Sequence, residues 1–399
     1  MESIKIKSQF GGFVSGLLPL FVLAHAGHHL LTALPIPLSP MIRSDFSLDY
    51  TYAGWVISAF NLSYGIGQLP GGWLADRFGP RIMMTMGICG TALAGFFVGL
   101  SQNFWMMIIF LALMGVMGGG YHPAAPAMIS ASVERRRQGQ ALGFHVIGGS
   151  ISFFLAPMIA AVIASYWGWR GSFITLSVFA MAFGIFFFEV LRRRAAAEGA
   201  RQKSVIRPQE SSVESYRWRH LVVFISMSSL AGAIIFSTTA FLPLYLVDRV
   251  GFSKETAGAF FALLYSGGLW AGPLGGYLSD RFGPIPVVLA VLFAAGPVVC
   301  LLQFAHSWVA AGILLLMIGM VIYVRMPVSE AYIVNKTPEH NRSAILGIYF
   351  FSHMEGGGVL TPVMGYLIDL LGFSLSFTIA GLLLVSVTLV GALLLRTRE

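Results

Sequence analysis

Ionisable side chains inside otherwise apolar runs are the residues of this sequence best suited to do chemistry. Arg325 lies in the run from Gly319 to Met326, with no acidic residue three or four positions away on either side. A guanidinium stays charged at physiological pH, and its planar fork binds carboxylate, phosphate or sulfonate groups. Arg325 is therefore a candidate ligand for an anionic solute. The alternative is an ion pair with Glu330 or Glu355 in the folded protein.

Three histidines form a second candidate group in the first apolar run. His28 and His29 follow His25 by three and four positions, which places the three side chains near one face of a helix. Imidazole titrates near physiological pH, so these residues are candidates to hold an anion or, for His29, to carry a coupling proton. The alternative is hydrogen bonding between helices. No cysteine or carboxylate lies nearby, so we expect no metal site.

Further polar side chains in the apolar runs are candidates to line the same cavity. They share the ability to hydrogen-bond solute oxygens, or else to bridge helices. The spacings of three and four on the second run put three of them in one polar stripe. The stripe is Asn61, Tyr64 and Gln68, and the other candidates are Tyr121, His122, His145 and Tyr265.

Glu355 is the candidate proton carrier. It lies near the middle of a late apolar run, where an ionised carboxylate is costly unless it faces water or a partner. A carboxyl group in that position can take up and release one proton in each transport cycle. The alternative is a permanent ion pair with Arg325 or with a histidine of the first run.

Composition places these residues in a membrane protein. Of the 399 residues, 56% are hydrophobic and 11% are charged, whereas soluble domains carry about 25% charged residues. Mean hydropathy is +0.78. A chain this apolar has too little polar surface to face water on all sides, so the bilayer is the expected solvent. The first run is expected to stay as an uncleaved anchor, and Cys89 and Cys300 are expected to be packing residues.

The apolar runs predict twelve membrane-spanning helices, each of about the length that a bilayer requires. The predicted spans are 13–38, 52–73, 82–101, 104–130, 138–164, 171–191, 219–247, 255–278, 286–305, 308–333, 342–369 and 373–395. The polar segment 192–218 reads as a flexible linker between two six-helix halves.

The basic residues predict the orientation. With the N-terminus inside, 20 of the 25 Lys and Arg residues fall in inner segments, four in outer loops, and Arg325 within a span. This asymmetry places both termini in the cytoplasm. The net charge of +8 therefore reports on topology, and nucleic acid binding is not expected.

A repeat divides the chain into two halves. Gly71 to Pro80 recurs 204 residues later as Gly275 to Pro284, with eight of ten positions identical. The same offset aligns Gly54 with Gly258, Pro123 with Pro327 and Gly168 with Gly372. A constant offset over this length indicates a duplicated bundle, and duplicated bundles are typical of transporters that rock about a central site. The repeat also relates Tyr121 to Arg325.

These motifs resemble those of the major facilitator superfamily. Gly72-x-x-x-Asp76-Arg77-x-Gly79-x-Arg81 is similar to that family's loop between helices 2 and 3. Gly276-x-x-x-Asp280-Arg281-x-Gly283 is similar to its loop between helices 8 and 9, although Ile285 replaces the last arginine. Within the family, Ser58-Ala59-Phe60 through Tyr64, Gln68 and Pro70 resembles anion:cation symporters, and His122-Pro123 resembles fosmidomycin-resistance-type exporters.

The resemblance implies a conformational latch made of these motif residues. Asp76 would dock at the start of the eleventh span and Asp280 at the start of the fifth, because helix N-termini attract carboxylates. Arg281 would pair with Glu330. These contacts would form only while the cytoplasmic side is closed. The alternative is a tight turn, in which Gly79 and Gly283 supply unusual backbone angles.

We therefore expect an all-α integral membrane protein of the major facilitator fold, with bundles 1–191 and 219–399 joined by the linker 192–218. The expected function is proton-coupled transport of a small organic solute, preferably an organic anion, across the inner membrane. The alternatives are proton-driven export of drugs or amphipathic lipids and, in another class, a non-transporting sensor. No enzyme activity, cofactor or metal is expected. The expected partners are the solute, protons and lipid, with the chain acting as a monomer.

Overall fold

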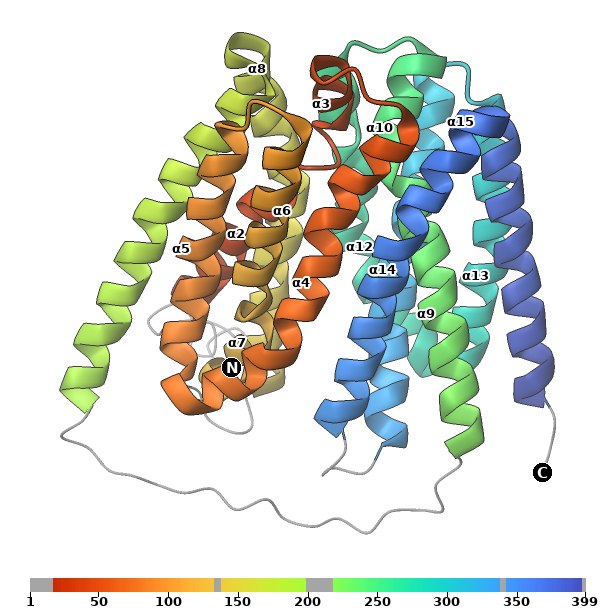
Figure 1. Cartoon of the computed structure of the whole chain (residues 1–399). Coiled ribbons are helices and arrows are strands. Elements are labelled where there is room, and N and C mark those ends of the chain that lie inside the picture. The colour runs from red at the N-terminus through yellow and green to blue at the C-terminus, as the bar shows by residue number, and fades with distance from the viewer. Residues whose placement is uncertain (1–16, 133–137, 199–217, 338–341, 397–399) are drawn as a thin grey trace, which may run out of the picture. The chain divides into compact units, whose positions relative to one another are not determined.

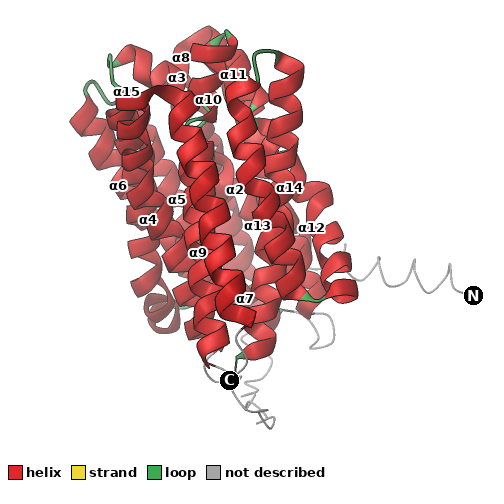
Figure 2. Cartoon of the chain, turned by 90° about the vertical axis from the view of Figure 1, so that its right-hand side faces the viewer, coloured by secondary structure: helices red, strands yellow, loops and turns green. Residues whose placement is uncertain are grey.

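The computed structural model describes residues 17–132, 138–198, 218–337 and 342–396, and within these ranges it contains helices and no strand (Figures 1 and 2). The first helices are α2 (Leu18–Thr32), α3 (Ser39–Asp45), α4 (Tyr50–Phe78), α5 (Pro80–Gly99), α6 (Phe104–Gly119), α7 (Tyr121–Ala131) and α8 (Gln138–Glu198). The later ones are α9 (Trp218–Ala240), α10 (Leu242–Tyr245), the π-helix η2 (Leu246–Val250), α11 (Lys254–Phe260), α12 (Ala262–Phe282), α13 (Pro284–Leu301), the 3₁₀ turn η3 (Leu302–Phe304), α14 (Trp308–Lys336) and α15 (Arg342–Arg396).

Side-chain caps fix several helix starts. Asn103 Oδ1 accepts a hydrogen bond from the backbone N–H of Met106 at 3.0 Å, just before α6. Ser307 Oγ accepts one from the N–H of Ala310 at 3.2 Å, just before α14. Such caps satisfy N–H groups that have no partner inside the helix.

Among the described residues, seven helical stretches are long and apolar enough to cross a membrane, or eight if the bent pair Lys254–Gly272 and Leu274–Phe282 forms one span. Two of the seven, Phe144–Arg194 and Ile348–Arg396, contain a glycine with a non-helical backbone. Each of these two stretches covers a pair of predicted spans. The all-α membrane fold is confirmed, and the number of twelve crossings stays a prediction.

The chain packs as two compact units, Met1–Leu34 with Ser63–Gln202 and Pro35–Leu62 with Lys203–Glu399. The predicted bundles 1–191 and 219–399 differ from these units in residues 35–62, which pack with C-terminal residues. The two predicted six-helix bundles stay a prediction. Of the predicted linker, residues 199–217 lie outside the described residues.

Within each unit the helices pack in a matching order. In the first unit, α8 packs along α2 and α5, and α5 packs against α6. In the second unit, α15 packs along α9 and α13, and α13 packs against α14. Buried aromatic side chains fill both interiors, with Phe21 and Phe187 in the first unit and Phe224 and Phe377 in the second.

The 204-residue repeat is reproduced in backbone geometry. Gly79 and Gly283 precede α5 and α13 with φ of +89° and +85°, values that favour glycine. Gly168 and Gly372 break α8 and α15 with φ of +67° and +73°. The expected turn role of the two motif glycines is therefore confirmed, because a side chain at either position would strain the backbone.

Candidate functional site

The first unit brings seven of the predicted site residues together in one buried group, here called the histidine cluster. The members come from four helices, which explains why no short sequence motif contains them. They are His25, His28 and His29 from α2, Tyr64 from α4, Tyr121 and His122 from α7, and His145 from α8.

Stacked rings pack against one another in this cluster. The rings of His25 and His145 stack with centroids 4.2 Å apart and an interplanar angle of 11°. The rings of His28 and Tyr121 stack at 4.2 Å and 7°. His28 is 0% exposed, whereas His122 is half-buried. The cluster is therefore a packed aromatic group with one partly accessible member.

Hydrogen bonds to the ring nitrogens orient the histidines of α2. His25 Nδ1 donates to the carbonyl oxygen of His145 at 2.7 Å, and His28 Nε2 lies 3.0 Å from the hydroxyl of Tyr64. His29 Nδ1 lies 2.9 Å from Thr32 Oγ1. A ring whose Nδ1 donates to a carbonyl keeps a lone pair on Nε2 when it is neutral. His25 therefore presents a lone pair on Nε2.

Several polar atoms of the cluster have no hydrogen-bond partner among the described residues. They are His25 Nε2, His145 Nε2 and the hydroxyl oxygen of Tyr121. A buried polar atom without a partner costs about 1–3 kcal/mol. Unpaired groups of this kind point to a functional role.

Arg325 occupies a corresponding position in the second unit, on α14. Its side chain is 1% exposed. Its Nη1 donates to the carbonyl oxygen of Ser228 at 2.9 Å, to Ser228 Oγ at 3.1 Å and to the hydroxyl of Tyr349 at 3.3 Å. Among the described residues no carboxylate forms an ion pair with it. In this conformation, polar groups of α9 and α15 therefore hold the guanidinium.

The repeat relates this arginine site to the histidine cluster. Positions 121 and 145 correspond to positions 325 and 349 at the offset of 204. Tyr121 and His145 stack with centroids 6.0 Å apart, and Arg325 contacts Tyr349. Equivalent positions of the repeat are therefore in contact in both units, as two stacked rings in the first unit and as an arginine and a tyrosine in the second.

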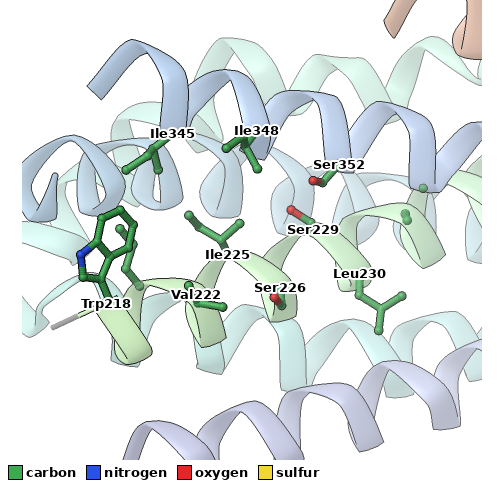
Figure 3. Close-up of a pocket in the computed structure, with 12 residues that line it drawn as sticks. Trp218, Val222, Ile225, Ser226, Ser229, Leu230, Ile345, Ile348 and Ser352 are labelled. Atoms are coloured by element: carbon green, nitrogen blue, oxygen red, sulfur yellow. The ribbon is translucent and has the colours of Figure 1, made fainter. Parts of the chain in front are cut away.

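A groove of about 420 Å³ lies between α9 and α15 in the second unit (Figure 3). Its wall is mainly apolar, with Trp218, Ile225 and Ile348 among the lining side chains. Figure 3 shows Ser229 of α9 and Ser352 of α15 facing the same part of the groove. Ser229 Oγ is buried and has no described hydrogen-bond partner. Such a lining suits an amphipathic molecule with one or two polar groups. The sequence analysis did not identify this groove.

The remaining predicted ligands do not join one site. Asn61 Nδ2 donates to the carbonyl oxygen of Ile57 in its own helix at 2.9 Å. Gln68 and Tyr265 are half-buried, and the ring of Tyr265 lies edge-on to Phe261 with centroids 5.3 Å apart. Glu355 is half-buried, and its Oε1 has no described hydrogen-bond partner.

The motif residues lie at the end of α4, at the start of α5 and at the end of α12. The guanidinium of Arg77 lies 5.5 Å from the ring centroid of Trp73, and that of Arg81 lies 5.3 Å from the ring centroid of Phe188. Arg281 Nη1 donates to the hydroxyl of Tyr277 at 3.3 Å.

The latch itself stays a prediction. The surroundings of Gly72 and the side chain of Asp76 lie outside what the structure describes. Gly276 and Asp280 are exposed. Glu330 is half-buried and, among the described residues, forms no ion pair with Arg281.

Sequence reasoning missed a charged network at the start of α4, here called the α4 network. Asp369 of α15 accepts hydrogen bonds from the backbone N–H groups of Tyr50 and Thr51 at 2.9 and 2.8 Å. Asp248 forms an ion pair with Arg43 at 2.9 Å and accepts a hydrogen bond from the hydroxyl of Tyr50 at 2.5 Å. The sequence signal that could have found it is the position of Asp248 and Asp369 at the ends of two apolar runs. A carboxylate at a helix N-terminus is stabilised by the helix dipole.

The part of the chain that the structure describes is helical, with at least seven apolar spans and ionisable groups buried inside them, which is typical of a multi-pass membrane protein. The sequence profile of the Major Facilitator Superfamily matches residues 21–323 and 251–399. The chain therefore belongs to the Major Facilitator Superfamily, a family of membrane transporters. The family resemblance seen in the motifs is confirmed.

Curated relatives and solved structures are similar to the chain, and the solved structures share its fold. The chain is 27% identical over 337 residues to the multidrug resistance protein MdtG of Escherichia coli strain 536, covering 83% of this chain and 81% of that protein. It is equally similar to MdtG of Salmonella arizonae, with 83% and 82% covered. A peptide transporter of the POT family, solved with sulfate, superposes with a TM-score of 0.77 at 14% identity, covering 94% and 93% of the two chains. A bacterial homologue of the lysosomal transporter Spinster, in an inward-facing state, gives 0.72 at 14%, covering 95% of each chain.

Proposed function

We propose that this protein is a secondary active transporter that exports amphipathic organic compounds by alternating access. The observation that carries this proposal is the likeness to multidrug resistance proteins over 83% of the chain. The groove between α9 and α15 supports it, because apolar walls with a few serine hydroxyls bind amphipathic molecules through buried surface and few directed hydrogen bonds. Export of amphipathic compounds is the alternative function that the sequence predicted.

Transport of an organic anion is the second candidate, and Arg325 favours it. A guanidinium at 1% exposure, held by hydroxyl and carbonyl groups and by no described carboxylate, keeps its positive charge available. An anionic solute would compete with Ser228 and Tyr349 for its N–H groups once the helices around it part. The candidate thus requires a conformation in which Arg325 faces the solute.

Proton coupling is proposed for Glu355 and His29. Glu355 Oε1 is buried without a described partner, which suits a carboxyl that is protonated in part of the cycle. His29 exchanges a hydrogen bond with His122 and belongs to the histidine cluster. The driving force would be the proton gradient of a bacterial inner membrane, with both termini in the cytoplasm and the monomer as the working unit.

Two sets of contacts are proposed to hold alternate states. The motif residues around Asp76 and Asp280 would close the cytoplasmic side, as in the predicted latch. The α4 network would close the opposite side, because its carboxylates tie the start of α4 to C-terminal helices. If residues 35–62 move with the N-terminal helices during transport, the α4 network must break once in each cycle.

The export proposal is tested by dye accumulation in cells that lack their own exporters. Expression of the protein should lower the steady-state amount of a lipophilic fluorescent dye inside the cells. A protonophore, which removes the proton gradient, should raise the amount of dye again. Ser229→Phe should fill the groove and restore the dye content as well. Ser386→Phe, at an exposed serine of α15 outside the groove, is the matched control and should still export.

The second candidate is tested with the same protein in proteoliposomes. Arg325→Lys keeps the charge but loses the planar fork, so it should weaken transport of organic anions and spare export of neutral dyes. If no dye is exported and a pH gradient drives anion uptake that Arg325→Lys impairs, the anion function replaces the export function.

A further inference from the structure

Three histidines of the cluster place ring nitrogens close enough to share one ligand. One ring nitrogen from each of His25, His29 and His122 lies within 4.8 Å of the other two. His29 and His122 face each other through their Nε2 atoms, which are 3.2 Å apart. A tetrahedral Zn²⁺ with Zn–N bonds of about 2.0–2.1 Å needs nitrogen atoms roughly 3.4 Å apart, so a small adjustment of His25 completes the geometry.

Hydrogen bonds of the other ring nitrogens orient these histidines in the way that is typical of metal sites. The Nδ1 of His25 donates to the carbonyl oxygen of His145 at 2.7 Å, and the Nδ1 of His29 lies 2.9 Å from Thr32 Oγ1. Metal-binding histidines generally use the second ring nitrogen in this way, which leaves the lone pair of the first directed at the metal. His25 Nε2 is buried and has no described partner, so its lone pair is available.

We propose that His25, His29 and His122 bind a divalent transition-metal ion of the Zn²⁺ type. Three neutral imidazoles suit Zn²⁺, Co²⁺, Ni²⁺ or Cu²⁺ and do not suit Mg²⁺ or Ca²⁺, which prefer oxygen. The fourth position would take an oxygen donor from outside the chain. His122 is half-buried, so the ion has a route to the site. When the metal binds, the hydrogen between the two Nε2 atoms moves by way of solvent to Nδ1 of His122, so both rings stay neutral and no net proton is gained or lost. His29 cannot carry a coupling proton while the metal is bound.

His28 provides the matched control. Its Nδ1 lies 3.3 Å from the carbonyl oxygen of Gly87 and its Nε2 lies 3.0 Å from the hydroxyl of Tyr64, so both nitrogens are engaged. His28 sits in the same cluster and on the same helix as two of the proposed ligands. Substitution of His28 should therefore test the general effect of losing a histidine here, without removing a ligand.

The test uses the full chain, purified without a polyhistidine tag and stripped with a chelator. Titration with Co²⁺ should give the visible absorption of a tetrahedral site, and Zn²⁺ should displace it, with about one ion bound per chain by elemental analysis. His122→Ala and His29→Ala should reduce bound metal to background, while His28→Gln should retain it. Thr32→Val should weaken affinity by about 10–100-fold, as loss of a second-layer partner does.

A gain of signal guards against misfolded variants. His122→Cys keeps a ligand but changes nitrogen to sulfur, so the Co²⁺ complex should acquire a thiolate charge-transfer band in the near ultraviolet. Absence of Co²⁺ and Zn²⁺ binding by the folded wild-type chain would overturn the proposal. Binding that persists unchanged in the His29→Ala, His122→Ala and His122→Cys variants would overturn it as well. These readouts do not depend on transport, so they fail or succeed separately from the proposed function.

Discussion

Arg325 illustrates at the residue scale how a buried charge is kept in the interior of a membrane protein. Its Nη1 makes three contacts, with the carbonyl and hydroxyl of Ser228 and the hydroxyl of Tyr349. Hydrogen bonds to a charged donor contribute about 1.5–3 kcal/mol each, more than neutral ones. The guanidinium is thus a link between α14, α9 and α15 in this state as well as a candidate ligand.

Removing this link should lower stability. Arg325→Ala leaves a cavity and unpaired acceptors, each costing about 1–3 kcal/mol, so the thermal unfolding midpoint should fall. Tyr349→Phe removes two long hydrogen bonds, at 3.3 Å to Arg325 Nη1 and at 3.4 Å to Ser228 Oγ, but leaves the charged group in place, so it should lower the midpoint less. Arg194→Ala, at an exposed arginine of α8, should leave the midpoint unchanged. An Arg325→Ala protein as stable as wild type would show that the contacts contribute nothing.

Glu355 gives a second prediction at this scale. The amide in Glu355→Gln cannot take up or release a proton, so accumulation driven by a pH gradient should be lost while exchange of solute across the membrane is retained. Proteoliposomes measure both activities. Glu189→Gln is the control, because Glu189 is an acidic residue of α8 that pairs with Arg192 and Arg193. Accumulation that survives in Glu355→Gln would remove this residue as the proton carrier.

At the scale of elements, small residues decide how closely the helices approach. A Cβ added at Gly71 would lie 2.9 Å from the Cα of Gly120, and one added at Gly275 would lie 3.0 Å from the Cα of Val324. These two contacts are related by the offset of 204, so α4 meets the end of α6 as α12 meets α14. Backbone-to-backbone approach of this kind is how helices associate without a hydrophobic driving force between them.

Filling one such contact should separate the helices. A Cβ at Gly67 would lie 2.7 Å from the carbonyl oxygen of Val116, which is backbone and cannot rotate away. Gly67→Ala should therefore destabilise the protein by about 1–3 kcal/mol. At Gly272 the nearest atom would be 3.8 Å away, so Gly272→Ala should be neutral or stabilise by up to about 1 kcal/mol. Thermal unfolding of both variants in one detergent compares them, and equal midpoints would contradict the prediction.

At the scale of the whole molecule, breaking the α4 network should be detectable by chemical labelling of a buried cysteine. Asp369→Asn removes the charge that accepts the N–H groups of Tyr50 and Thr51. The substitution should lower the free energy of opening at the start of α4 by about 1.5 kcal/mol. A thiol reagent should then label the cysteine in Ala53→Cys, a buried position in α4, about ten times faster. Glu255→Gln, a change of an acidic residue on α11, should leave the rate unchanged. An unaltered rate in Asp369→Asn would mean that the network does not restrain α4.

Orientation is the other prediction at this scale. In a background without Cys89 and Cys300, a cysteine at Gln102 should react with an impermeant maleimide in intact cells. A cysteine at Ser204, in the predicted linker, should react only after the cells are opened. The physical basis is the retention of basic segments on the cytoplasmic side. The reverse pattern would invert the proposed topology.

Some features of the fold could be read from the sequence because they are local or compositional. Helices in a bilayer must satisfy their own backbone groups, so long apolar runs have few alternatives to helix. The glycines at 79, 168, 283 and 372 mark breaks because their backbone angles are set by residues next to them. The count of twelve spans is harder to read from helices alone, since α8 and α15 each run through a break.

The family could be predicted from the sequence through motif residues that resemble those of a known family. The duplicated halves and the short list of polar residues in apolar runs could be predicted from spacing and composition. Only the tertiary structure decided which of them meet. His122 lies 93 positions from His29, and Asp369 lies 319 from Tyr50. Helices that are apolar on every side give no periodic signal of which face turns inward. Packing of side chains against neighbouring helices sets that rotation, and with it the histidine cluster, the contacts of Arg325 and the α4 network.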